Sequence, residues 1–186
     1  MPRAVLDTNV IFSRVLHELF GRLATTGNLL ELIWSDDLVD ETTRVLVDDK
    51  GLSRENAELW VGLMTDAFPA GRVDTARLPP DLNLSALTSD DDDHHICALA
   101  VAGAANYLLT FDQSFNRLAL RTLGIEVVEP DVFLSDAIDE EPDLFREILV
   151  EQAAAWGGRT VKELIDAIER TKASVFASKA RRLFHD

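Results

Sequence analysis

The sequence predicts an α/β fold in which a central, mostly parallel sheet is covered on both faces by helices and is followed by a helical C-terminal extension. The first observation is that short apolar, strand-like runs alternate with helix-like segments as far as about residue 130. Such alternation is typical of a parallel sheet. The second observation is that only helical periodicities follow the segment "DAIDEEPD" (136–143).

Four short apolar runs are expected to form the strands of this sheet. Each is short and apolar, which suits a buried strand. The second run is ambiguous between strand and helix, and we interpret it as a short strand. The runs are "RAVLD" (3–7), "LLELIWS" (29–35), "NYLLT" (106–110) and "IEVVEP" (125–130).

Helices are expected between these strands. Aspartates begin a helix expected over 36–49, where the helix dipole favours acids, and Ser53 is the expected N-cap of the next helix. Another helix follows the aspartates of 90–93 and extends to about Ala102, with Gly103 as its stop. A short helix is expected after the third strand. An apolar stripe at helical spacing predicts one more helix over 10–24, and it consists of Phe12, Leu16, Leu19, Phe20 and Leu23.

Three helices are expected in the C-terminal extension. Gly157 and Gly158 separate the first from the second, and Thr160 with Glu163 forms a capping-box pattern at the start of the second. The third is expected over 174–184. The apolar stripes of the first two helices are Leu144, Phe145, Ile148 and Leu149, then Val161, Leu164, Ile165 and Ile168.

The chain length of 186 residues suits one domain and a small appendage. We expect a main domain over 1–135 and a helical extension over 140–186 that packs on the main domain or on a partner. No apolar run approaches the roughly 20 residues that cross a bilayer, and no signal-peptide pattern is visible. Cys97 is the one cysteine, which excludes an internal disulfide and a cysteine zinc site. We therefore expect a cytoplasmic protein with no membrane partner.

The net charge of −15 argues against a broad electrostatic attraction to nucleic acid. The charge is uneven, because residues 170–186 carry five basic residues and one acidic residue. This basic tail could form a local phosphate-binding surface, or its cations could simply balance acidic neighbours.

Two aspartates follow predicted parallel strands directly. Asp7 ends "AVLD" and Asp112 lies just beyond "YLLTF", at the sheet edge where α/β proteins bind ligands. Asp93 stands at the start of the "HHICALA" helix, and Glu41 lies on the helix over 36–49. If these elements converge, three or four carboxylates share one cleft.

Carboxylates that share a cleft repel one another and lose hydration. The arrangement is stable only if protons are shared or a cation binds. Hard oxygen ligands select Mg²⁺ or Mn²⁺, which can activate water and stabilise a phosphate during hydrolysis.

Each of these residues also has a purely structural interpretation. A strand-end aspartate such as Asp7 often caps the following helix, and Glu41 could be a surface acid. Asp90, Asp91 and Asp92 are interpreted as solvated helix caps. Asp93 is the preferred ligand of the run because it lies nearest the helix, with Asp92 second. The side chains of His94 and His95 are expected to cap the helix or to face solvent, with metal ligation as the minor alternative.

Four motifs, taken in order, resemble those of the PIN-domain ribonucleases, and most of all the VapC toxins of prokaryotic toxin–antitoxin pairs. The resemblance covers about residues 1–135, and the helical tail resembles a C-terminal extension that some members carry. It implies a PIN-like three-layer α/β/α sandwich, hydrolysis of RNA phosphodiester bonds with Mg²⁺ or Mn²⁺, a homodimer, and a cognate antitoxin that blocks the site. The motifs are "VLDTNV", "DETTRVL", "DDDHHICALA" and "LLTFDQSF".

The resemblance also assigns residues. Spacing to the apolar "ICALA" places the third acid of the family on Asp93 rather than Asp92. Thr8 and Asn9 match the "DTN" of the family and are expected to support the loop of Asp7. Thr110 matches a hydroxyl residue that usually precedes the fourth acid and is expected to have a supporting role. The four acids of the family fall on Asp7, Glu41, Asp93 and Asp112.

Three functions remain open from the sequence. The first is a metal-dependent endoribonuclease in which Asp7, Asp93 and Asp112 hold one or two ions and Glu41 completes the shell or orients water. The second is a PIN-like module with weak or lost catalysis, whose acidic cleft binds a basic antitoxin-like partner or RNA. The third is a phosphatase with Asp7 as nucleophile, which Asn9 disfavours because haloacid-dehalogenase-type enzymes have a second aspartate there. The RNA target is not encoded in any recognisable pattern.

Overall fold

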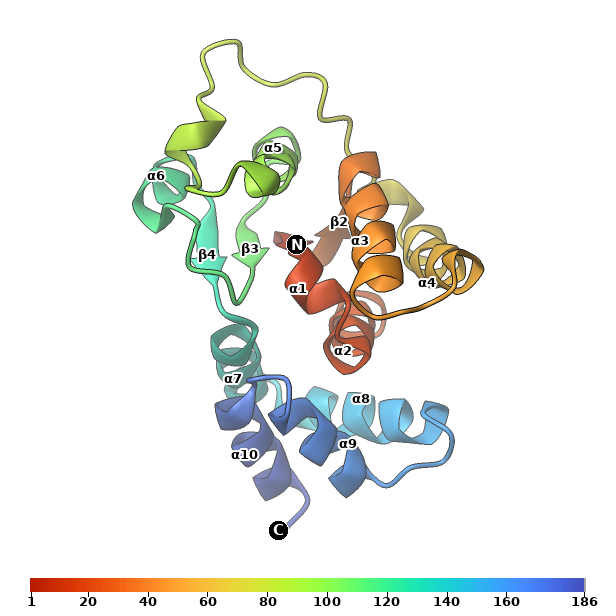
Figure 1. Cartoon of the computed structure of the whole chain (residues 1–186). Coiled ribbons are helices and arrows are strands. Elements are labelled where there is room, and N and C mark those ends of the chain that lie inside the picture. The colour runs from red at the N-terminus through yellow and green to blue at the C-terminus, as the bar shows by residue number, and fades with distance from the viewer. Residues whose placement is uncertain (186) are drawn as a thin grey trace. The chain divides into compact units, whose positions relative to one another are not determined.

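A computed structural model describes residues 1–185 and contains a four-stranded sheet flanked by helices, with the strand order β2-β1-β3-β4 (Figure 1). β1 is central and pairs in parallel with both β2 and β3, so that Val5 lies opposite Ile33 on one side and Leu108 on the other. The predicted α/β class and all four predicted strands are confirmed. The strands are β1 Arg3–Leu6, β2 Glu31–Ile33, β3 Tyr107–Leu109 and β4 Glu126–Val128.

The helices alternate with these strands and then continue alone, as the sequence predicted. Short 3-10 turns lie at Pro69–Gly71, Leu84–Ala86 and Asp91–Asp93. The α-helices are α1 Thr8–Ile11, α2 Arg14–Thr25, α3 Asp36–Asp48, α4 Arg54–Ala67, α5 His94–Ala102, α6 Arg117–Thr122, α7 Pro130–Glu140, α8 Pro142–Ala155, α9 Val161–Glu169 and α10 Ser174–Leu183.

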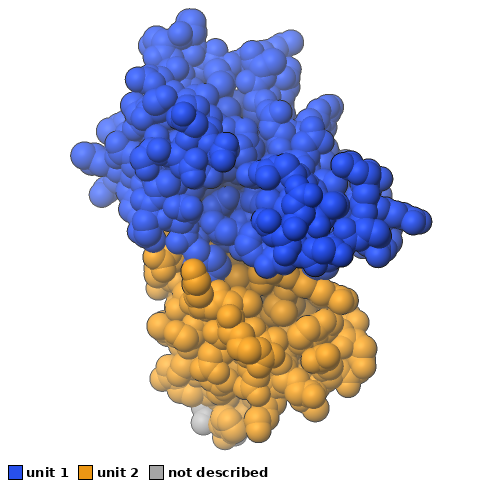
Figure 2. All heavy atoms as spheres, in the orientation of Figure 1, with its two compact units in different colours: residues 1–12, 30–127 blue, residues 13–29, 128–186 orange. Residues whose placement is uncertain are grey.

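Contacts divide the chain into two compact units, shown in Figure 2. The first comprises Met1–Phe12 and Leu30–Val127 and holds the sheet except Val128, the last residue of β4. The second comprises Ser13–Leu29 and Val128–Asp186 and contains α2 and α7 to α10. The division differs from the predicted domains, 1–135 and 140–186, because it groups α2 and α7 with the C-terminal helices. Those domain limits stay a prediction.

The single helix predicted over 10–24 is wrong, because the chain breaks into α1 and α2. Phe12 ends α1, and Ser13 is extended, with φ −82° and ψ 97°. The apolar stripe continues across the break, which is why side-chain periodicity alone predicts one helix. Within the second unit, the Gln152 side-chain amide donates to the Val15 carbonyl over 2.9 Å, and the Phe20 and Phe133 rings lie 5.9 Å apart.

The helix α7 was not predicted. Pro130 is its first residue, a position where a missing N–H costs nothing. α7 supplies the N-terminal cap of α10, because the N-cap residue of α10 is Ala173, whose side chain cannot accept a hydrogen bond. Instead the Asp131 carboxylate accepts from the backbone N–H groups of Val175 (3.1 Å) and Phe176 (2.7 Å), which satisfies the start of α10.

Two of the five cations of the basic tail, Lys179 and Arg181, pair with acids of their own unit. The Lys179 ammonium donates to the Asp139 carboxylate over 2.5 Å and also to the Ser135 carbonyl. Arg181 binds both Asp166 (2.7 Å) and Glu169 (2.6 Å). These pairs favour the charge-balancing interpretation of the tail over a phosphate-binding surface.

Local helix signals in the sequence are confirmed at two helix starts. The Ser53 side chain accepts from the Asn56 N–H at the start of α4. Thr160 and Glu163 form the full capping box of α9, with both reciprocal hydrogen bonds present. No helix described between residues 1 and 185 has the length and apolar character that a membrane crossing requires.

The end of α5 lies at Gly103 as predicted, but for a different reason. Gly103 has φ −81°, and the left-handed residue is Ala104, with φ 47°. Gly103 is needed for close packing, since an added Cβ would lie 2.4 Å from Ile33 Cδ1 and 2.9 Å from the Leu99 carbonyl oxygen.

We predict that Gly103→Ala lowers the free energy of unfolding by about 1–3 kcal/mol, because the new methyl group meets β2 and the backbone of α5. Gly62→Ala is the matched control, because it adds the same methyl within α4 where no atom lies within 4 Å. It should stabilise the protein by about 0.5–1 kcal/mol through helix propensity. Urea denaturation measures both, and equal effects would contradict the packing role of Gly103.

A second prediction concerns His17 on α2, where burial lowers the pKa of the imidazole from 6.5 to about 4. As the pH falls from 6.5 to about 4, His17 therefore binds a proton in the unfolded chain but not in the folded protein. Stability should fall with pH by up to about 1.4 kcal/mol per pH unit between 6 and 4. As the pH falls from about 6 to about 4, the urea midpoint of the wild type should fall relative to that of His17→Gln, and parallel pH profiles would refute the assignment.

Candidate active site

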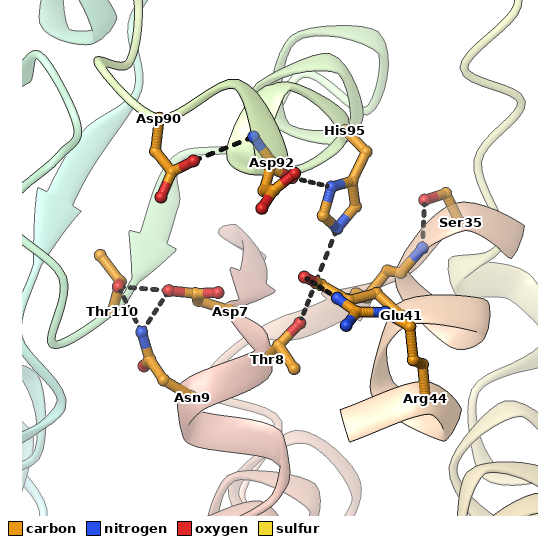
Figure 3. Close-up of polar contacts among 11 residues, drawn as sticks. Asp7, Thr8, Asn9, Ser35, Glu41, Arg44, Asp90, Asp92, His95 and Thr110 are labelled. Carbon is orange, nitrogen blue, oxygen red and sulfur yellow. Dashed lines mark hydrogen bonds and ion pairs between the residues drawn. The ribbon is translucent and has the colours of Figure 1, made fainter. Parts of the chain in front are cut away.

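Asp7 lies at the carboxyl end of β1, 4% exposed, and is tied to β3 by a 3.0 Å hydrogen bond from its N–H to the Leu109 carbonyl. One carboxylate oxygen, Oδ2, accepts from the Thr110 hydroxyl over 2.5 Å and from the Asn9 amide (Figure 3). Thr110 Oγ1 in turn accepts from Asn9 over 3.1 Å and from the Asp112 N–H over 2.8 Å. Thr110 and Asn9 thus hold the Asp7 carboxylate in one orientation.

The surroundings of Asp7 disfavour its charge. Burial raises the pKa of this carboxyl, the Thr110 hydrogen bond lowers it in part, and the charges of Asp93 and Glu41 raise it again, to about 6 overall. The carboxyl therefore lies within the electrostatic reach of two other acids from distant parts of the sequence.

Ser114 links Asp93 to Asp112 by donating a hydrogen bond to each carboxylate. The Ser114 hydroxyl donates to Asp93 Oδ2 over 2.7 Å, and its N–H donates to Asp112 Oδ1 over 2.7 Å. Asp93 occupies the N-cap position of α5, yet its side chain makes no capping hydrogen bond. Burial raises the pKa of the Asp93 carboxyl, and the charges of Asp90, Asp112 and Glu41 raise it further.

The other three aspartates of the run differ from Asp93. Asp90 caps the 3-10 turn Asp91–Asp93 by accepting from the Asp92 N–H over 3.0 Å, as expected of a cap. The Asp91 side chain is 92% exposed and lies near His94. The Asp92 side chain is also exposed. Only Asp93 is half-buried and linked to a second acid, and its preference over Asp92 as ligand stays a prediction.

Glu41 is surrounded by hydrogen-bond donors and cations. The Thr8 hydroxyl donates to its Oε2 over 2.5 Å, and His95 Nε2 lies 2.9 Å from the same oxygen. This second contact is an ion pair whose N–H is not aligned as a hydrogen bond. The Arg44 guanidinium lies 3.7 Å from Glu41 Oε1.

His95 is therefore a site residue that the sequence did not predict, since it was expected to cap the helix or face solvent. Its side chain is 17% exposed, and its Nδ1–H donates to the Asp92 carbonyl over 2.7 Å (Figure 3). Burial lowers the pKa of His95, but Glu41 and the Asp92 carbonyl outweigh it and hold the pKa above its usual value. For Glu41 the balance is the reverse. Burial raises the pKa of its carboxyl, but His95 and Thr8 outweigh burial and bring the pKa below its usual value.

Ser114 is the second residue that sequence reasoning missed. Its position two residues after Asp112 in "DQSF" was the available signal, because such spacing allows a backbone hydrogen bond back to the aspartate. Nothing in the sequence indicated that its hydroxyl would reach Asp93, which lies 21 positions earlier.

Comparison with protein families places these residues in a known context. The model described as PIN domain matches residues 3–114, and the model described as VapC50 C-terminal domain matches residues 130–182. The chain belongs to the PIN-domain family. PIN domains are typically nucleases, and the second match identifies the helical tail as an extension of VapC type. No curated protein and no solved structure is significantly similar to this chain.

The PIN domain brings its four predicted acids into one electrostatic neighbourhood. Asp7 is affected by Asp93 and Glu41, and Asp93 by Asp112 and Glu41. Among residues 1–185, however, no three Asp, Glu, His or Cys side chains converge closely enough to form a ready-made metal cage.

The chemistry of the PIN-domain site nevertheless fits a divalent cation. Its acids offer carboxylate oxygens, the ligands that Mg²⁺ and Mn²⁺ prefer. Over the described residues, no lysine or arginine forms an ion pair with Asp7, Asp93 or Asp112. Glu41 differs, because His95 and Arg44 already offset its charge.

We predict that Asp7→Asn stabilises the metal-free protein by about 1–3 kcal/mol at pH 8. The ionised carboxylate is buried near other acids, and its raised pKa means that stability is lost as the pH rises from 3.8 through about 6. Asparagine can still accept from Thr110. Thermal melts in EDTA measure the effect, which should vanish near pH 4.

The control for this stability prediction is Asp91→Asn, which removes an equal charge from an exposed side chain. It should leave the melting temperature within error of the wild type. A destabilised Asp7→Asn protein at pH 8 would show that the carboxylate is not under electrostatic strain.

Proposed function

We propose that this protein is a divalent-metal-dependent endoribonuclease and the toxin of a type II toxin–antitoxin pair. The observation that supports the proposal is that Asp7 and Asp93 influence each other electrostatically, that Ser114 links Asp93 to Asp112, and that no lysine or arginine pairs with these three acids in the described chain. Such a set is stable with its charges intact when a cation is present.

Asp7, Asp93 and Asp112 would hold Mg²⁺ or Mn²⁺. When bound, such an ion lowers the pKa of a water molecule and neutralises charge on the scissile phosphate. The net charge of −15 disfavours RNA binding. The ion would offset the repulsion between the acidic site and RNA.

The side chains of the protein itself position the reacting groups. Thr110 and Asn9 orient the Asp7 carboxylate, and Ser114 fixes Asp93 relative to Asp112. Glu41, kept ionised by His95 and Thr8, completes the shell or accepts a hydrogen bond from the attacking water. In-line attack by water on phosphorus releases a 3′-hydroxyl and leaves a 5′-phosphate.

The family context supports the remaining parts of the proposal. The VapC-type extension favours a cognate antitoxin as partner. A homodimer and a cytoplasmic location stay predictions. The alternative is a catalytically weak module whose acidic site binds a basic partner, and the retention of all four acids with their supporting hydroxyls argues for cleavage.

Cleavage of RNA tests the proposal. Purified protein, freed of any inhibitor, is incubated with total RNA and with transfer RNA in Mg²⁺, in Mn²⁺ or in EDTA. Discrete fragments with 5′-phosphate ends are expected only with metal. Asp7→Asn and Asp93→Asn should each reduce the rate on the order of 100-fold or more, and Asp92→Asn separates the two candidate ligands of the run.

Asp91→Asn is the matched control, because it removes one charge from the same run at an exposed position. It should cut at the wild-type rate. If no metal supports cleavage, or if Asp7→Asn cuts as fast as Asp91→Asn, the nuclease assignment fails and the binding module takes its place.

A further inference from the structure

We propose that Arg44 binds a backbone phosphate of the RNA substrate beside the acid cluster, an inference that rests on the proposed nuclease function. Arg44 lies on α3, one helical turn after Glu41, and its side chain extends along the helix toward that carboxylate (Figure 3). It lines a pocket of about 280 Å³ together with Asp40, Glu41, Asp92 and His95.

The Arg44 guanidinium is free to take a new ligand. Its side chain is 61% exposed, and its one contact in the described chain is the 3.7 Å approach to Glu41 Oε1, which is longer than a hydrogen bond. Only the Arg44 side of this pair is exposed, and at 3.7 Å, without a hydrogen bond, its contact with Glu41 is readily exchanged. By contrast, Arg72 is held by two hydrogen bonds to Asp36.

The other cation of the pocket is already used. His95 contacts Glu41 with one ring nitrogen and the Asp92 carbonyl with the other, and its side chain is mostly buried. Its Nε2 is buried against Glu41 and its Nδ1 is taken by Asp92, so neither nitrogen is accessible to an incoming anion. Arg44 is the lining residue of this pocket with unused donors.

A phosphate is the ligand that suits these donors. Acids repel a polyanion from this face, so RNA needs a local cation to enter it. An arginine fork binds phosphate through two parallel N–H···O bonds, which fixes direction as well as charge. A phosphate that takes Arg44 from Glu41 still leaves Thr8 and His95 on the other oxygen of Glu41. The acid thus remains positioned while RNA is bound.

Steady-state cleavage of a single-stranded RNA by Arg44→Gln tests the role of Arg44. The expected result is a KM raised about tenfold with kcat changed less than about twofold, because a phosphate contact away from the reacting bond binds ground state and transition state alike. Arg54→Gln is the matched control, because Arg54 forms a similarly weak pair, 3.6 Å from Glu58, on the neighbouring helix α4. It should leave both constants unchanged.

Binding of the same RNA gives a second readout. Binding is measured in an Asp7→Asn background to prevent cleavage. Replacing Arg44 should make the negative slope of log affinity against log salt shallower by about 0.7, as expected for one lost phosphate contact on single-stranded nucleic acid. RNAs with a single neutral methylphosphonate should identify one linkage whose replacement weakens the wild type but not Arg44→Gln.

Two outcomes would overturn the inference while the nuclease assignment stands. One is metal-dependent cleavage in which Arg44→Gln and Arg54→Gln behave alike. The other is a loss of kcat with KM and the salt slope unchanged, which would mean that Arg44 acts by holding Glu41. If the wild type neither binds nor cleaves RNA, the proposed function fails together with the phosphate contact.

Discussion

The parallel pairing of β1 with β3 is the constraint on which the site depends. The register that aligns Leu6 with Leu109 brings Asp7 beside Thr110, although the two residues are 103 positions apart. The strands are buried on both faces, so a slip of one residue would force each side chain into the close packing of the opposite face. The hydroxyl of Thr110 then orients the Asp7 carboxylate and receives the N–H of Asp112.

The acids around this sheet edge are of two kinds. Asp7, Asp93 and Asp112 are held by hydroxyl, amide and backbone donors, and for Asp7 and Asp93 burial and neighbouring charges raise the pKa. Glu41 is held by a histidine and approached by an arginine, and its pKa is lowered. The first group suits a cation that is not part of the chain, whereas Glu41 suits the task of orienting water or substrate because its charge is already balanced.

The helical unit is stabilised by contacts that its own helices cannot supply alone. α10 has no capping side chain, and Asp131 on α7 caps it from 44 positions away. Lys179 links the same two helices through Asp139, and Arg181 links α10 to α9. These interactions occupy Lys179 and Arg181, two of the five cations of the tail, so the charges of these two residues serve the packing of the helices.

The sequence by itself determined the α/β class, the four strands, most of the helices and their local caps at Ser53 and Thr160. These features depend on hydrophobic periodicity and on hydrogen bonds between residues three positions apart, which are visible in any short window. Motif order also indicated four acids and the PIN-domain family. The break after Phe12 was not predicted because the apolar stripe continues through it. The helix α7 was not predicted because the strand pattern extended to Pro130. Only the tertiary structure decided that His95 faces Glu41, that Ser114 links Asp93 to Asp112 and that Arg44 keeps unused donors, since these contacts depend on the relative placement of elements far apart in the chain.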